Sequence, residues 1–464
     1  MVVREFENRH FYKEYIIIGS GISGLLASKE LENFKKDHII LTSFFSSKAT
    51  KKTQKSRFNN IEFKRTSPKL NIESLKKELK NWNNFYNLNC KGFNLIQTLS
   101  NSTGGLTQYW GANLGHNYNE IIESNIEQIM EVNKACDIKD LRGIKMQSHL
   151  ADKLLLSKTD HSKLINVFSP FLGIKIKNED QSLCRKCKAH YCNCDGKLLQ
   201  KYNFKRELIE ELEIIDINKT KNDIFLLTGT DKKNKTKMIE CKYIIFACGP
   251  IASSILLNKL VKLPDNLNLN HNGLFSFPFI SLFASKQKSL ALSNLNISIN
   301  FLRNKSKNYE PEFYANIFTL KPQLLIRFPF LKILSKRILN RLYYCIVYTD
   351  SSFVKSKFNI QNKKIRGKYK ISFFYFSILV YLRLIPFLLI KGLSIPIFFP
   401  IFSKPGSDIH YGSTLANINL SENLDKRIFF ADSSRVEKIS AINSTIKNLV
   451  FARKGLKNWI KEHN

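Results

Sequence analysis

A short apolar run followed by closely spaced glycines constrains the fold of this chain more than any other feature. Residues 15–18 predict a buried strand, and Gly19, Gly21 and Gly24 follow at once and lead into a helical pattern over 25–33. In this order the first glycine permits a tight turn, and the second lets backbone approach a pyrophosphate. The third lets helix and strand pack closely, so the pattern predicts a dinucleotide bound at the turn.

A second strand, predicted over 39–42, completes a βαβ unit and therefore indicates a parallel sheet. Such a strand normally ends in an acid that hydrogen-bonds the ribose. This one ends in Thr42 and Ser43, so we expect a hydroxyl group, chiefly that of Thr42, to replace the usual carboxylate.

Four separated segments resemble the glucose-methanol-choline (GMC) family of FAD-dependent oxidoreductases, especially its bacterial members with a cysteine-rich insertion. Their order along the chain is that of the family. The segments are the glycine turn; Gly104-Gly105-Leu106 with Trp110-Gly111; the stretch 243–257, which contains Ala247 and Gly249; and His410-Tyr-Gly-Ser-Thr414 with Asp432-Ser433-Ser434 and Asn443-Ser-Thr445.

The resemblance implies an α/β fold, with a Rossmann-like FAD-binding domain made of a parallel sheet and helices, and an α+β substrate domain. It places the discontinuous FAD-binding domain at 1–115, 205–270 and 405–464. Residues 116–204 would then form an insertion, and 271–404 a substrate and membrane-facing domain.

The resemblance also implies chemistry at the cofactor. Oxidation of a CH–OH group moves a hydride to the flavin and a proton to a base, and a histidine with an ordinary pKa of about 6.5 can take that proton. His410 is the predicted base and Asn443 its partner, while Asp432 and Ser433 would receive the ribityl or pyrophosphate region of FAD. The predicted substrate is a small-molecule, sugar, lipid or lipid-linked alcohol, and the electron acceptor is unknown, with a quinone or another protein as candidates.

Thiols and one imidazole crowd together within the predicted insertion. The predicted ligands are Cys184, Cys187, His190, Cys192 and Cys194. A tetrahedral zinc ion accepts Cys₃His and Cys₄ sets alike. The resemblance to the bacterial members implies a cubane iron-sulfur site here instead, although His190 takes the place of its third cysteine. The third interpretation of this cluster is a remnant loop that binds no metal and has free thiols.

Charge suggests partners. The net charge of +35 would suit nucleic acid, an anionic membrane or a phosphorylated substrate, although a general bias of the sequence toward Lys, Asn and Ile explains it equally well. Over 321–400 we count fifteen Lys or Arg against one acid, Asp350, among many aromatic and aliphatic residues. This favours a membrane surface, and nucleic acid is the partner with the least support.

The apolar stretch 371–402 is interrupted by Arg383, Lys391 and three prolines, so we expect interfacial contact and no spanning helix. A second basic and apolar segment, 325–341, is expected to behave in the same way. The N-terminus lacks the apolar core of a signal peptide, so the expected location is cytoplasmic, peripheral at the inner face of a membrane. Two alternative functions stay open: a non-catalytic, membrane-associated nucleotide-binding protein, and a nucleic-acid-binding flavoprotein.

Overall fold

The structure is a computed structural model. It describes residues 11–43, 88–90, 93, 113–115, 165–168, 171–172, 206–231, 233–283, 295–299, 312–319, 336–339, 341–397, 399–408, 410–416, 418, 424–441 and 445–463.

The strand, turn and helix predicted near the N-terminus are confirmed. They are β1 (Phe11–Ile18), α1 (Ile22–Asn33) and β2 (His38–Thr42). β1 lies parallel to β2, with Ile17 opposite Ile40. The first strand begins four residues earlier than the apolar run indicates, because polar residues can continue a strand beyond its buried part.

β1 lies at the centre of the first of two seven-stranded sheets. The sheet has the order β6-β2-β1-β9-β8-β7, and β21 also pairs with β9. The pairs among β6, β2, β1, β9 and β21 are parallel, whereas β8 is antiparallel to both β9 and β7. The remaining strands of this sheet are β6 (Ile209–Glu211), β7 (Glu213–Lys219), β8 (Phe225–Thr230), β9 (Thr236–Phe246) and β21 (Ile428–Phe430).

Both faces of this sheet are buried. Ile16 and Ile18 of β1 belong to one hydrophobic cluster, and Tyr15 and Ile17 belong to another on the opposite face. The first cluster includes α7 (Pro250–Leu260), and the second includes α1 and α11 (Thr445–Glu462). Helices on both sides explain why β1 is a continuous apolar run instead of an alternating one.

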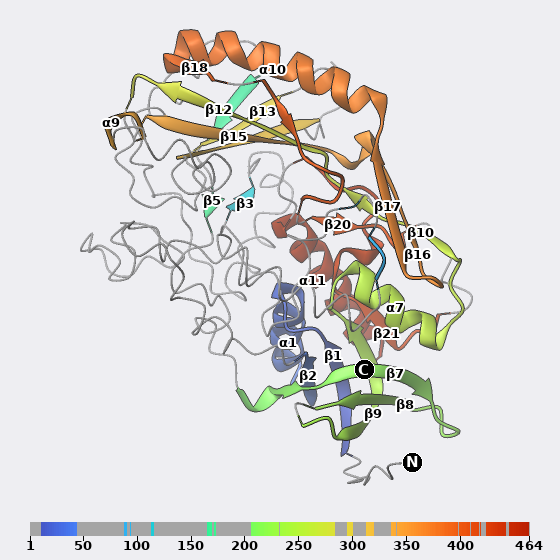
Figure 1. Ribbon diagram of the computed structural model, residues 1–464. Helices are drawn as coiled ribbons and strands as arrows, with labels where there is room; N and C mark the ends of the chain where they lie inside the picture. The colour runs from blue at the N-terminus through green and yellow to red at the C-terminus, as the bar shows by residue number, and fades with distance from the viewer. Residues whose placement is uncertain are drawn as a thin grey trace, which may run out of the picture.

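The second sheet is antiparallel, with the order β18-β12-β15-β14-β13-β4, and β19 also pairs with β12. It lies at the opposite end of the molecule from α1 and β1 in Figure 1, with α10 (Ile371–Gly392) along its outer side. Its strands are β4 (Ile165–Phe168), β12 (Leu274–Ser281), β13 (Leu295–Ile299), β14 (Phe313–Thr319), β15 (Leu342–Thr349), β18 (Ser394–Pro396) and β19 (Ile401–Phe402).

Two findings here differ from the sequence expectations. Residues 116–204 are predicted to form an insertion, but Ile165–Phe168 within them forms β4, which pairs with β13 of the second sheet. The predicted domain boundaries themselves stay a prediction. The stretch 371–402 was expected to be interrupted, but α10 continues through Arg383 and Pro386. Pro386 removes one backbone hydrogen bond, and this loss does not end the helix because the residues before and after Pro386 are packed in the core.

By length and composition alone, α10 is long enough to cross a membrane. Its most apolar window has a mean hydropathy of 2.1, and 33% of that window is buried inside the protein. The segment 325–341 is described only at α9 (Lys336–Leu339) and Arg341, so the expectation for it stays a prediction.

Three smaller sheets complete the described strands. They are β10 (Asn266–Asn268) with β16 (Val354–Asn359) and β17 (Lys364–Tyr369); β11 (Asn270–His271) with β20 (Tyr411–Gly412); and β3 (Asn113–Gly115) with β5 (Phe171–Leu172). Short 3-10 turns lie at η5 (Arg206–Leu208), η7 (Ser351–Phe353) and η8 (Ser433–Arg435).

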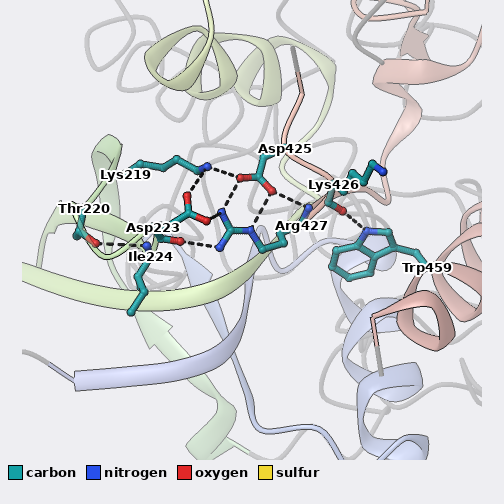
Figure 2. A network of polar contacts seen from close by, with 8 residues as sticks. All are labelled: Lys219, Thr220, Asp223, Ile224, Asp425, Lys426, Arg427 and Trp459. Atoms are coloured by element: carbon teal, nitrogen blue, oxygen red, sulfur yellow. Dashed lines mark hydrogen bonds and ion pairs between the residues drawn. The ribbon is translucent and has the colours of Figure 1, made fainter. Parts of the chain in front are cut away.

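A network of charged residues fixes the start of β21 to the β7–β8 hairpin (Figure 2). Arg427 donates two hydrogen bonds to the carboxylate of Asp425, at 2.9 and 2.7 Å. It also lies 2.8 Å from a carboxylate oxygen of Asp223, and Lys219 lies within 2.7 Å of both acids. Burial alone would raise the pKa of Asp425, but the hydrogen bonds from Arg427 and Lys219 outweigh it and hold that pKa below its usual range.

The same segment is tied to α11, because Trp459 Nε1 donates to the carbonyl of Lys426 at 2.7 Å (Figure 2). β21 therefore enters the sheet at a fixed position. The residues that follow β21 are among those that the sequence predicts at the cofactor.

Candidate active site

Three parallel strands end side by side at one edge of the first sheet. Ile18 of β1 lies opposite Phe246 of β9, and Phe246 lies opposite Phe430 of β21. Gly19, Ala247 and Asp432 therefore follow their strands at the same edge. In α/β sheets ligands bind outside the carboxyl ends of the strands, so the chain brings three separated predicted segments to the place where a ligand is expected.

The glycines of the first turn differ in what surrounds them. Gly19 has a φ of +112°, and a Cβ there would lie 2.4 Å from the carbonyl oxygen of Ala247. A Cβ at Gly24 would lie 1.9 Å from the carbonyl oxygen of Gly19. Neither position tolerates a side chain, since such distances are far below van der Waals contact.

Gly21 is different, because no described atom lies within 4 Å of a Cβ placed there. Its backbone is partly accessible and has ordinary negative φ. Packing of the described residues therefore does not require glycine at this position. Close approach of a ligand to the backbone would require it, which is what the fingerprint assigns to the second glycine.

The two helices that begin at this edge also differ. Among the described residues no side chain caps the N-terminus of α1, and its first turn contains no acid. The first turn of a helix carries N–H groups without intrahelical acceptors and a partial positive charge. The start of α1 therefore suits a phosphate group.

At the start of α7, a carboxylate of the protein already accepts hydrogen bonds. Asp432 Oδ2 accepts hydrogen bonds from the backbone N–H of Gly249 at 2.9 Å and from the hydroxyl of Ser253 at 2.5 Å. Asp432 Oδ1 accepts from the N–H and the hydroxyl of Ser434, at 3.0 and 2.6 Å. Asp432 thus joins the turn after β9 to the turn after β21.

Burial raises the pKa of Asp432 above its usual value, although these four donors act in the opposite direction. The carboxylate is engaged with the protein on both oxygens, which is the arrangement of a structural cap for η8 and α7. The predicted contact of Asp432 and Ser433 with FAD stays a prediction.

Thr42 lies at the end of β2 and is buried. Its hydroxyl shares a hydrogen bond with that of Ser20, at 2.6 Å between the two oxygens. Thr42 therefore ties the second strand to the glycine turn. Its predicted contact with a ribose stays a prediction.

The segment that contains His410 runs beside the turn that follows β21. The N–H of Ser413 donates to the carbonyl of Ser433 at 3.1 Å, and the hydroxyl of Ser433 donates to the carbonyl of Tyr411. The hydroxyl of Thr414 donates to the carbonyl of Pro250 at 3.0 Å, at the start of α7. The histidine segment is thereby held next to the edge where the three strands end.

His410 is paired with an acid that the sequence analysis did not single out. Its Nδ1 lies 3.1 Å from both carboxylate oxygens of Asp408, which is buried, whereas His410 is partly accessible. A carboxylate accepts, so Nδ1 carries the proton and Nε2 is left to act as an acceptor. The spacing of acid and histidine, two residues apart, was the available signal.

His410 also contacts the second sheet. Its ring centroid lies 6.5 Å from that of Tyr348 of β15, in an edge-on arrangement. Tyr348 is partly accessible, and desolvation of its hydroxyl group raises its pKa above the usual value. The histidine thus lies between the strand ends of the first sheet and a strand of the second.

Several predicted site residues lie outside the described part of the chain. They are Gly104, Gly105, Trp110, Asn443 and the predicted metal ligands Cys184, Cys187, His190, Cys192 and Cys194. Over the residues that the structure does describe, no group of three or more His, Cys, Asp or Glu could hold a metal ion. Zinc or iron-sulfur binding by the cysteine cluster therefore stays a prediction.

Comparison with known proteins gives a match in structure only. No family profile matches the sequence, and no curated protein sequence matches it. Formate oxidase from Aspergillus oryzae matches with a TM-score of 0.61 at 10% identity, covering 98% of this chain and 99% of that one. A fungal aryl-alcohol oxidase matches with a TM-score of 0.53 at 9% identity, covering 97% of this chain and 99% of that one.

At these identities the similarity concerns the fold. Both proteins are GMC oxidoreductases, so the fold agrees with the family that the sequence motifs resemble. The chain thus has the fold of FAD-binding flavoproteins, with mixed sheets and helices.

Proposed function

We propose that this chain is an FAD-dependent oxidoreductase of the GMC type that dehydrogenates a CH–OH group. The observation that carries the proposal is the contrast among the three glycines. Gly19 and Gly24 are required by packing, whereas no described atom lies within 4 Å of a Cβ placed at Gly21, and close approach of a ligand would account for glycine there. The study of the Aspergillus oryzae protein concerns FAD modification in a formate oxidase of the same fold.

The residues that would hold FAD follow from the strand ends. The N–H groups at the start of α1 would bind the pyrophosphate, and the Rossmann-like turn would place it beside Gly21. Ala247 and Gly249 would border the cofactor from β9, and Asp432 would keep their turn in place through its bond to Gly249. When bound, FAD supplies the acceptor for a hydride.

The proton would be taken by His410. Nε2 accepts the hydroxyl proton of the substrate, and Asp408 holds the opposite ring nitrogen as N–H and stabilises the imidazolium that forms. Asn443 is proposed to orient the substrate oxygen. Asp408 is a positioning residue in this scheme, because it acts on the substrate only through His410.

Anaerobic mixing of the purified protein with primary alcohols, sugars and hydroxylated lipids tests this function. We expect at least one of these alcohols to bleach the absorption of oxidised flavin. His410→Gln should slow that reduction by about 10²–10⁴-fold, as for the loss of a general base, and Asp408→Asn should slow it and shift its pH profile.

His463→Gln is the matched control, since His463 lies at the end of α11 against Trp459. It should reduce its flavin at the wild-type rate. Equal rates in the His410→Gln protein and the wild type would refute the assignment of the base. Bound flavin that none of the alcohols reduces would refute the reaction class.

A further inference from the structure

The outward side of α10 is apolar along its whole length. Ile371, Tyr375, Ile378, Leu382 and Leu389 follow one another at intervals of three to seven residues and are all exposed, Ile371 by 88% and Leu382 by 55%. At 3.6 residues per turn these positions lie on one side of the helix.

The same surface continues beyond the end of the helix. Leu393, Ile395, Ile397 and Phe399 are exposed as well, Phe399 by 84%. β18 lies against α10 at this end and is a border strand of the second sheet. We name these nine residues of α10 and of the segment that follows it the outer apolar face; solvated surfaces of monomeric proteins rarely expose so continuous an apolar patch.

The inward side of α10 belongs to the core of the second sheet. Val380, Leu384 and Leu388 are fully buried, and the ring of Tyr381 lies 5.0 Å from that of Phe277 of β12. A helix that left this position to cross a bilayer would expose those rings to water. The geometry therefore favours a helix that lies on a membrane with its outer side and remains part of the domain with its inner side.

Charge next to the helix selects the kind of membrane. Lys368, Lys370, Arg383 and Lys391 lie on α10 or directly before it, and residues 351–407 contain no Asp or Glu. Lys368 and Lys370, just before α10, and Arg383 within it are exposed. Long basic side chains beside an apolar surface can reach phosphate groups while their stems cover apolar area.

We propose that the outer apolar face docks on the surface of an anionic lipid bilayer and holds the protein there as a monotopic membrane protein. The face supplies the apolar contact, and the basic residues around it supply the attraction to anionic headgroups. The proposal goes beyond the oxidoreductase function and does not depend on bound flavin. If both hold, the candidate active site works beside a membrane, where lipid or lipid-linked alcohols are concentrated.

Flotation of the full chain with vesicles tests the proposal. We expect the wild type to float with vesicles of phosphatidylcholine and phosphatidylglycerol, to bind vesicles of phosphatidylcholine alone more weakly, and to lose the difference at high salt. Ile378→Ser with Leu382→Ser should lower the partition coefficient by at least about tenfold, since each buried CH₂ group contributes to membrane affinity.

Matched controls distinguish binding through the outer apolar face from nonspecific hydrophobic binding. Ile215 of β7 and Phe451 of α11 are also exposed apolar residues, and Ile215→Ser with Phe451→Ser should bind vesicles as the wild type does. Lys368→Glu with Lys370→Glu leaves the apolar face intact and should reduce binding to anionic vesicles by at least about fivefold per residue. This second variant keeps the test valid if the serine variant does not fold.

Three results would overturn the proposal. The wild type could bind neither kind of vesicle, or both variants could bind as well as the wild type. The wild type could also form a dimer that Ile378→Ser with Leu382→Ser dissociates, without any vesicle binding, in which case a second copy covers the face.

Discussion

The glycines and titratable side chains of the candidate site show which roles of single residues can be predicted from the sequence. Each fingerprint glycine has surroundings that fit its expected role: Gly19 takes a positive φ, Gly24 is in close backbone contact and Gly21 is open. These roles could be predicted because the backbone alone determines them. The partner of Asp432 could not be predicted, because Gly249 is 183 residues away and only the fold brings the two together. Asp408 lies two residues from His410, so its spacing was a local signal for that pair.

His271 offers a test of burial at the residue scale. It belongs to β11 and is fully buried against β16, with Nδ1 donating to the carbonyl of Asn272 at 2.9 Å and Nε2 accepting from the hydroxyl of Ser356 at 2.8 Å. Burial lowers its pKa to about 4. The unfolded chain, with an ordinary histidine pKa of about 6.5, binds the proton first as pH falls.

The contribution of His271 to stability is therefore complete above about pH 6.5 and is lost as the pH falls toward about 4. Between about pH 7.5 and about pH 5 we expect the free energy of unfolding to fall by about 2 kcal/mol from this residue alone. Urea unfolding at both values should show a smaller fall in His271→Gln than in the wild type. A fall of the same size in both proteins would contradict the assignment, and His463→Gln is the control that should retain it.

Elements whose signal is local were predicted well. The β1–α1–β2 unit follows from apolar runs and glycines in one stretch of sequence. β4 and α10 show the limits: β4 becomes a strand through pairing with β13, far along the chain, and α10 persists through Pro386 because its inward side is packed. Pairing and packing of this kind have no local signature.

One ion pair connects two helices on the same face of the first sheet. Glu30 of α1 is fully buried and accepts a hydrogen bond from Nε of Arg453 of α11, which is almost fully buried. Removing one partner leaves a buried charge uncompensated, which costs about 3–5 kcal/mol. We therefore expect Arg453→Met to lower the free energy of unfolding by about that amount.

The double variant Glu30→Leu with Arg453→Met should recover most of the lost stability, because no unpaired charge remains. Urea unfolding of the wild type, both single variants and the double variant measures the coupling. If the two single effects simply added, the pair would not be coupled and the helices would be held by packing alone.

At the scale of the whole molecule, the resemblance in motifs and the similarity in fold support each other. The fold is shared with two oxidases at about a tenth identical residues, so the agreement does not come from overall sequence likeness. Of the motifs that resemble the GMC family, those in the described residues lie at or beside the strand ends of the fold that the two oxidases share. The second sheet contributes Tyr348 beside His410. Its strands contain no motif that resembles the family, so its topology was not predicted.

Binding of FAD is the central claim, and one measurement tests it most directly. The purified full chain is incubated with FAD, passed over a sizing column and examined by absorption, beside a Gly21→Glu protein. We expect the wild type to retain one FAD per chain and Gly21→Glu to retain none. The thermal midpoints of the two flavin-free proteins should be equal, because no described atom lies within 4 Å of a Cβ placed at Gly21. A wild-type protein without flavin, or a Gly21→Glu protein that retains as much as the wild type, would contradict the account.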